Sequence, residues 1–160
     1  MTRPLTADRP SVVRVRYAET DQMGVAYYAN YLVWFEVART DWLRHAGSSY
    51  RRMEEAGVLL PVIQAHCDYQ QPARYDDQLE VRAEASLLSP VRMRFDYEVV
   101  GEVVGEEAVV LARGHTVHAA VDRAGRPCRL PADIRALLAP TRPSPETARR
   151  PSRQRAARPR

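Results

Sequence analysis

Several features that would assign a chain to a broad class of protein are missing here. The 160 residues contain no apolar run near the roughly 18 residues needed to cross a bilayer, and residues 1–10 lack the apolar stretch of a secretory signal. We therefore expect a cytoplasmic protein with no membrane span. The only two cysteines, Cys67 and Cys128, have no Cys-x-x-Cys spacing, which argues against a disulfide framework and against a zinc site.

The common signatures of cofactor-dependent and serine-dependent chemistry are also absent. The sequence has no glycine-rich phosphate-binding loop, and Ser48, Ser49 and Ser89 lie in no nucleophile-elbow pattern. His115 and His118 are close in sequence, but residues three apart on a strand point to opposite faces and would not share a metal ion. We therefore expect no metal and no bound cofactor.

The positive charge of the chain is concentrated at its C-terminal end. The net charge is +4 and the pI about 9.4, yet residues 140–160 hold seven arginines and a single acid, so the rest of the chain is net negative. This proline-rich segment has almost no apolar residue to bury, which predicts a disordered basic tail. We expect no specific nucleic-acid partner, and only weak contacts of the tail with anions or a membrane surface.

The rest of the chain is long enough for one buried core. We expect residues 1–10 to be flexible and residues 11–139 to form one domain. Alternation of apolar and polar side chains predicts five half-buried antiparallel strands. These strands are expected at Val12–Tyr17, Val62–Gln71, Leu79–Leu87, Phe95–Val99 and Ala108–Val121. Turn-forming residues separate the last four at 72–77, 89–90 and 101–105.

One long apolar segment is predicted to be a helix. It begins near Ala29 and ends at Gly47, and its apolar side chains cover far more than a narrow stripe. Such a helix must be largely enclosed, and the five strands are available to enclose it. A shorter helix is expected at residues 50–56, and a final turn or short helix at residues 131–138. The sequence therefore predicts an α+β fold in which an antiparallel sheet covers one long helix.

A single carboxylate, Asp21, lies in the polar loop between the first strand and the long helix. The first N–H groups of a helix have no internal partner and carry the positive end of its dipole, so they can stabilise an oxyanion. Asp21 could attack a thioester carbonyl or activate a water while the backbone N–H of a residue such as Tyr28 polarises the carbonyl. An isolated Asp in a loop could equally only cap a turn.

Residues 15–39 read VRYAETDQMGVAYYANYLVWFEVAR. This segment resembles the signature of the YbgC and 4-hydroxybenzoyl-CoA thioesterase family, which are hotdog-fold acyl-CoA hydrolases. Further similarity lies in PARYDD at residues 72–77 and VDRAGRP at residues 121–127. The resemblance implies the hotdog fold, a long central helix wrapped by a five-stranded antiparallel sheet. It also implies hydrolysis of a small or medium acyl-CoA, or of an aryl-CoA, to free acid and CoA.

The resemblance assigns roles to two residues. Asp21 falls on the catalytic carboxylate of the family, which acts as nucleophile or general base. Tyr28 falls on the residue at the helix start whose backbone N–H polarises the thioester carbonyl. Many YbgC-like members have His there, so a role of that side chain does not carry over. Two protomers in this family pair their sheets, with active sites at the interface, which implies a homodimer or homotetramer.

Further candidates for substrate contact are aromatic or charged side chains. They are Tyr31 and Glu36 on the helix, and Arg74, Arg92 and Arg94, whose guanidinium groups could bind CoA phosphates. A local ion pair would also explain Glu36. Two alternatives to a thioesterase stay open. A hotdog hydratase normally uses an Asp and a His, and no His lies near Asp21 in the sequence. A non-catalytic hotdog scaffold would act through the basic tail.

Overall fold

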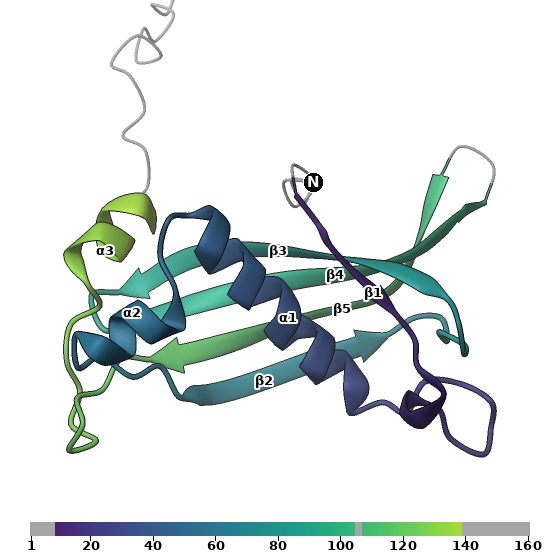
Figure 1. The fold of residues 1–160 in the computed structure, drawn as a ribbon, viewed down its shortest axis with the longest axis horizontal. Helices are drawn as coiled ribbons and strands as arrows, with labels where there is room; N and C mark the ends of the chain where they lie inside the picture. Colours follow the sequence, from purple (N-terminus) through teal and green to yellow (C-terminus); the bar gives the residue numbers. More distant parts are fainter. Residues whose placement is uncertain (1–8, 105–106, 139–160) are drawn as a thin grey trace, which may run out of the picture.

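The computed structural model describes residues 9–104 and 107–138. Five strands form one antiparallel sheet in the order β1-β3-β4-β5-β2 (Figure 1). Their bounds are β1 Ser11–Arg14, β2 Val62–Tyr69, β3 Gln78–Ser89, β4 Arg92–Val104 and β5 Glu107–Ala119. The predicted tail at residues 140–160, and residues 1–8 of the predicted flexible N-terminus, lie outside the described residues. Their predicted properties stay predictions.

The long helix α1 spans Asn30–His45 and crosses one face of the sheet (Figure 1). It ends before Gly47, whose φ of 81° is a left-handed value that glycine adopts without strain. Two short helices, α2 at Tyr50–Glu55 and α3 at Ala132–Leu138, lie at the far end of the sheet from the loop that leads into α1. The predicted α+β fold, with five antiparallel strands and one long helix, is confirmed. No helix of the described ranges is long and apolar enough to cross a membrane.

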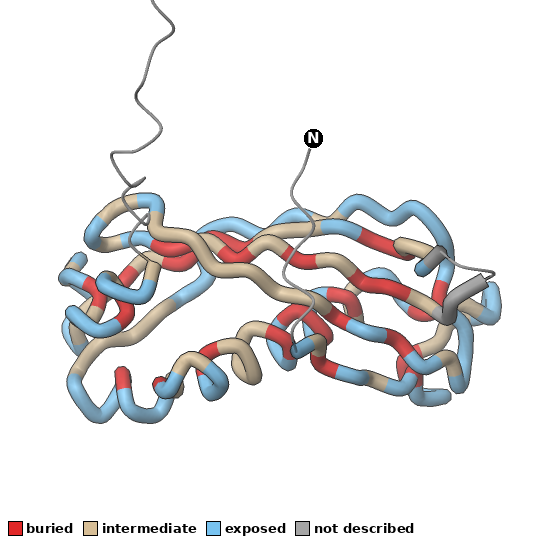
Figure 2. The backbone as a smooth tube through the Cα atoms, turned by 90° about the horizontal axis from the view of Figure 1, so that it is seen from above, coloured by how far each residue is buried: buried red, intermediate tan, exposed pale blue. Residues whose placement is uncertain are grey.

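The contact between α1 and the sheet centres on an aromatic stack. The Phe35 ring lies parallel to the Tyr97 ring of β4, with centroids 4.3 Å apart and an interplanar angle of 3°. Gly114 of β5 is paired with Tyr97, and a Cβ built on Gly114 would lie 2.6 Å from Cε2 of Phe35. Glycine is therefore required at this position for the helix to approach so closely. Figure 2 shows the buried residues along the helix and the sheet.

A buried polar chain continues beneath this stack. The hydroxyls of Tyr97 and Thr116 are 2.8 Å apart, and the Thr116 hydroxyl is 2.9 Å from Nε2 of His118. Burial lowers the pKa of His118 to about 4, so the ring is neutral at physiological pH. His115 is on the other face and stacks on His66, with ring centroids 5.3 Å apart. His115 and His118 therefore point to opposite faces of the sheet, as the alternation of side chains along a strand predicts.

Two predicted boundaries differ from the structure. The turn expected at residues 101–105 is wrong for residues 101–104, which lie inside β4. Gly101 lies at an irregularity in the pairing of β4 with β5, between the paired residues Val100 and Val103, and the strand continues past it. The first strand also ends earlier than predicted, at Arg14, and residues Tyr17–Glu19 form a 3-10 turn. The Glu19 carboxylate accepts from the Arg16 backbone N–H at 2.8 Å and closes this turn.

We predict that Gly114→Ala lowers the free energy of unfolding by about 1–3 kcal/mol, the usual cost of overpacking a core. The added methyl must displace the Phe35 ring or the backbone of β2. Urea unfolding at fixed protein concentration measures the loss. Gly101→Ala is the matched control, since its Cβ would meet only the flexible Leu111 side chain at 3.3 Å. Equal losses in the two variants would contradict this account of the helix contact.

Candidate active site

The loop before α1 is folded around the buried carboxylate of Glu19. Besides the Arg16 N–H, it accepts from the Arg16 guanidinium at 3.1 Å and the Trp34 indole N–H at 3.3 Å. Burial alone would raise the pKa of Glu19, but these hydrogen bonds together lower it. The Glu19 carbonyl oxygen accepts from the Tyr27 N–H and from the Asn30 side-chain amide, both at 2.8 Å. Glu19 therefore fixes both ends of the loop against the start of the helix.

Asp21 lies within this loop and has one carboxylate oxygen committed to a turn. Oδ1 accepts from the Met23 N–H at 2.8 Å, and the backbone N–H of Asp21 donates to the Val25 carbonyl at 2.9 Å. The chain reverses at Gly24, which has a φ of 73°. Oδ2 accepts no hydrogen bond from any described residue. Asp21 thus caps a turn, as the simpler interpretation predicts, and keeps one oxygen available for chemistry.

The start of α1 presents two backbone N–H groups without acceptors in the described part of the chain, those of Tyr28 and Ala29. The carbonyl of Tyr27 accepts from the Asn30 N–H at 3.0 Å, and the carbonyl of Tyr28 accepts from the Tyr31 N–H at 3.3 Å. The N-cap residue, Ala29, makes no side-chain cap. These N–H groups are therefore free to bind an anion or a polarised carbonyl oxygen.

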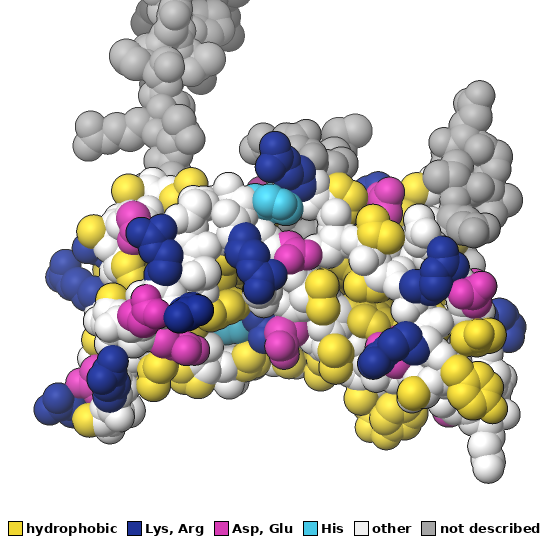
Figure 3. Space-filling model, in the orientation of Figure 1, with side chains coloured by type: hydrophobic (Ala, Val, Ile, Leu, Met, Phe, Trp, Pro, Cys, Tyr) yellow, Lys and Arg dark blue, Asp and Glu magenta, His cyan; other side chains and the backbone are white. Residues whose placement is uncertain are grey.

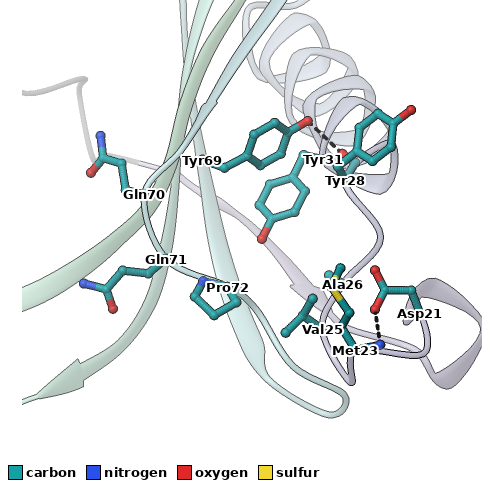
Figure 4. Close-up of a pocket in the computed structure, with 10 residues that line it drawn as sticks. All are labelled: Asp21, Met23, Val25, Ala26, Tyr28, Tyr31, Tyr69, Gln70, Gln71 and Pro72. Atoms are coloured by element: carbon teal, nitrogen blue, oxygen red, sulfur yellow. Dashed lines mark hydrogen bonds between the residues drawn. The ribbon is translucent and has the colours of Figure 1, made fainter.

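Asp21 and the helix start border one pocket of about 310 Å³. Figure 4 shows the loop residues Asp21 and Met23 on one side and the end of β2 with the following residues on the other. The pocket is lined by Asp21, Met23, Val25, Ala26, Tyr28, Tyr31, Tyr69, Gln70, Gln71 and Pro72. Among the described residues, no group of three His, Cys, Asp or Glu side chains could hold a metal ion. The pocket combines one carboxylate with mainly apolar and aromatic walls.

Two of the other predicted residues lie at or next to this pocket. The Tyr31 ring forms part of its wall, only 2% of the residue is exposed, and its hydroxyl accepts from the Ala73 N–H at 3.3 Å. Arg74 is exposed in the loop that follows the pocket residue Pro72. Its backbone N–H donates to the Asp77 carboxylate at 2.7 Å, and its guanidinium forms no hydrogen bond or ion pair with a described residue.

The structure does not bring the remaining predicted residues to the pocket of the same protomer. Glu36 is exposed on α1 and forms an ion pair with Arg39 at 3.8 Å. Arg94 forms a 2.6 Å ion pair with Asp96, and with Arg92 it alternates along β4 with buried residues that face α1. Both arginines are therefore on the sheet face opposite the helix. A role for them in binding CoA stays a prediction.

The sequence-based reasoning missed Tyr69. Its hydroxyl donates to the carbonyl oxygen of Tyr28 at 3.0 Å, and its ring packs edge-on against both Tyr28 and Tyr31. The two hydrogen-bonded residues are 41 positions apart in sequence, and only the pairing of β2 with β5 determines where Tyr69 lies. The only local signal was its position at the end of a strand, three residues before Pro72.

The sequence matches the Thioesterase-like superfamily over residues 15–138. This chain belongs to that family. A putative esterase of Aquifex aeolicus is 32% identical over 125 residues, which cover 78% of this chain and 93% of that protein. The putative acyl-CoA thioesterase YneP of Bacillus subtilis is 51% identical over 65 residues, 41% of this chain and 47% of YneP. The recognition of the family and the assignment as an enzyme of the thioester hydrolase class are confirmed.

Solved thioesterase structures share the fold. The crystal structure of Slr0204, a 1,4-dihydroxy-2-naphthoyl-CoA thioesterase from Synechocystis, aligns with a TM-score of 0.72 and 28% sequence identity. The alignment covers 80% of this chain and 93% of Slr0204. The predicted hotdog fold is therefore confirmed.

The backbone role of Tyr28 leads to a prediction that separates its N–H from its side chain. Tyr28→Phe should keep most activity, because the predicted contribution comes from the backbone and the residue is 60% exposed. Tyr28→Pro should be inactive, because proline has no N–H. Proline is tolerated at the second position of a turn, which Tyr28 occupies, so the fold should survive.

Steady-state hydrolysis of acyl-CoA substrates, with unfolding curves for both variants, checks this prediction. A hundredfold loss of kcat in Tyr28→Phe, about 2.7 kcal/mol of activation free energy, would show instead that the hydroxyl acts directly.

Proposed function

We propose that this protein hydrolyses an acyl-CoA thioester to free acid and CoA, with Asp21 as the nucleophile or general base. The observation that carries this proposal is the arrangement of the pocket. One oxygen of Asp21 is uncommitted at a pocket that Tyr28 also lines. The N–H groups of Tyr28 and of the next residue, Ala29, have no acceptor within the described residues. A carboxylate and a helix start are the two elements that acyl transfer needs. Family membership supports the same reaction.

Two routes lead from the thioester to the free acid and CoA. In the first, Asp21 removes a proton from water, the water oxygen adds to the thioester carbonyl carbon, and the carbonyl oxygen becomes an oxyanion. The C–S bond then breaks, and CoA leaves as a thiolate that takes up a proton. In the second, a carboxylate oxygen of Asp21 adds to the carbonyl carbon, the C–S bond breaks, and CoA leaves as a thiolate that takes up a proton. Water then hydrolyses the resulting mixed anhydride to the free acid and the Asp21 carboxylate. Both routes pass through an oxyanion that the Tyr28 N–H stabilises.

The acyl group is proposed to be small or medium, or aromatic. The pocket volume of about 310 Å³ is at the small end for ligand pockets. Tyr28, Tyr31 and Tyr69 supply aromatic walls that would contact a ring or a short chain. The name of Slr0204, a 1,4-dihydroxy-2-naphthoyl-CoA thioesterase, supports the inclusion of aryl thioesters. Arg74 is the predicted CoA ligand nearest to the pocket along the chain. No cofactor other than the CoA of the substrate is proposed.

The two alternatives have less support. A hydratase that uses an Asp and a His would need a histidine beside Asp21, and none of the residues that line the pocket is a histidine. A scaffold function would rest on residues 140–160, which lie outside the described residues. The uncommitted oxygen of Asp21 and the Tyr28 N–H, which has no acceptor among the described residues, belong to residues that line one pocket, and this favours catalysis over a scaffold that has lost it.

We also propose that the protein is a homodimer or a homotetramer built from dimers. β2 is an edge strand, paired only with β5. Exposed apolar side chains lie on this strand and on α1, and we call them the edge patch: Leu32, Val33, Val37, Val62 and Ile63. Apolar side chains are visible at several places along the lower border of the molecule in Figure 3, part of which is where Figure 1 places β2. A second copy of the chain would pair with the free edge and cover the edge patch.

The reaction is tested by substitution of the carboxylate. Asp21→Asn should abolish hydrolysis across a panel of short, branched, long and aromatic acyl-CoA substrates, because an amide neither attacks a carbonyl nor accepts a proton at neutral pH. The amide oxygen of the new side chain can still accept from the Met23 N–H, so the unfolding transition should stay close to wild type. A folded variant with near-normal turnover would reject the proposed role of Asp21.

The oligomer is tested in the edge patch. A Val33→Asp and Val37→Asp double substitution places two charges in the proposed interface and should convert the dimer to a monomer. Sedimentation velocity measures the mass of each species. Leu137→Asp is the matched control, since Leu137 on α3 is 49% exposed but lies outside the edge patch. A wild-type protein that sediments as a monomer would contradict the proposal.

A further inference from the structure

The Tyr69 hydroxyl makes a hydrogen bond for which the proposed reaction has no role so far. It donates to the Tyr28 carbonyl oxygen at 3.0 Å, although that carbonyl already accepts from the Tyr31 N–H within the first turn of α1. The donor comes from the end of β2, on a different element from the helix. A strand and a helix start are thereby joined at one peptide group.

That peptide group links Tyr28 to Ala29 and has two ends. Its oxygen accepts from Tyr69 and Tyr31, and its N–H belongs to Ala29. The N–H and the C=O of a trans peptide point in opposite directions. The Tyr69 hydroxyl and the Tyr31 N–H hold the carbonyl oxygen toward the body of α1. The Ala29 N–H therefore points the other way, toward the side where the Tyr28 N–H also lacks an acceptor among the described residues. A hydrogen bond to the carbonyl also polarises the peptide and strengthens its N–H as a donor.

The environment of Tyr69 keeps its hydroxyl in the donor form. Burial, together with the neighbouring Cys67 and Tyr31, raises the pKa of Tyr69 to about 12. The phenol therefore stays protonated throughout the physiological pH range, and it is no candidate for a general base. Its ring is held edge-on to Tyr31, with centroids 5.0 Å apart, and edge-on to Tyr28, with centroids 6.5 Å apart. Two aromatic contacts thus aim the hydroxyl at the Tyr28 carbonyl.

We propose that Tyr69 is a positioning residue for hydrolysis, and that its hydroxyl holds the Tyr28–Ala29 peptide so that the Ala29 N–H serves as a second donor to the oxyanion. The oxyanion then accepts from two backbone N–H groups, those of Tyr28 and Ala29. This inference rests on the proposed function, because it assigns a second donor to the same reaction. It adds a residue on β2 that touches no reacting atom and acts through the backbone of α1.

Tyr69→Phe tests the proposal, because it removes the hydroxyl and keeps the ring contacts. With a thioester that the wild type hydrolyses, we expect kcat to fall about tenfold, the effect of one lost hydrogen bond. KM should stay within about twofold, because the lost stabilisation develops only in the transition state. Tyr75→Phe is the matched control, since the exposed Tyr75 ring packs on Tyr17 and its hydroxyl bonds to no described residue. That variant should match the wild type.

A spectroscopic measurement excludes a merely structural effect. A thioester labelled with ¹³C at the carbonyl is bound to Asp21→Asn, and the shift of its carbonyl stretch to lower frequency reports polarisation. Adding Tyr69→Phe should reduce this shift. Incorporation of 3-fluorotyrosine at position 69 keeps a donor hydroxyl and should retain kcat. It also tests the proposal if Tyr69→Phe folds poorly.

The outcomes separate this inference from the proposed function. Wild-type kcat in a folded Tyr69→Phe variant, with Asp21→Asn inactive, would overturn the role of Tyr69 alone. A raised KM with unchanged kcat would also overturn it and make Tyr69 a wall of the binding pocket. Turnover that survives Asp21→Asn would instead reject the proposed reaction.

Discussion

The position of every functional group in this protein depends on how α1 is held against the sheet. The parallel stack of Phe35 on Tyr97 lies where Gly114 has no side chain. Because protein interiors are close-packed, this contact sets the distance between helix and sheet to within a methyl group. The helix is continuous over its 16 residues, so its contact at Phe35 also determines where its first turn lies. That first turn supplies the N–H groups of the candidate active site.

The site itself is built where the first turn of α1 meets two other segments. Glu19 holds the preceding loop against the helix through five hydrogen bonds, two of which its backbone carbonyl accepts. The end of β2 brings Tyr69 to the Tyr28 carbonyl from the other side. A loop carboxylate and a helix start are common in proteins. Here the buried Glu19 carboxylate and strand β2 hold the Asp21 loop and the start of α1 at one pocket. This suits catalysis, because hydrogen-bond donors that are already in place need no reorganisation during the reaction.

Much of the fold could be predicted from the sequence because its signals are local. Alternation along residues 79–87 predicted β3, and the apolar segment from Ala29 to Gly47 predicted α1. The wrong boundary at Gly101 arose because its local signal was ambiguous: a glycine suggested a turn, but the residue lies within β4. Arg94 stays a predicted phosphate ligand. Its ion pair with Asp96, on the sheet face away from α1, could not be predicted from the sequence.

The sequence by itself indicated the five strands, the long helix, and the placement of Asp21 seven residues before Tyr28 at a helix start. These features depend on residues close together in the chain, so periodicity and spacing encode them. The family was indicated by the resemblance of residues 15–39 to a known signature. Only the tertiary structure decided that Tyr69 reaches Tyr28, that Glu19 is buried beneath Trp34, and that Arg94 faces away from the pocket. Each of these depends on the register of strands and on the packing of α1, which arise from many weak contacts between segments far apart in sequence.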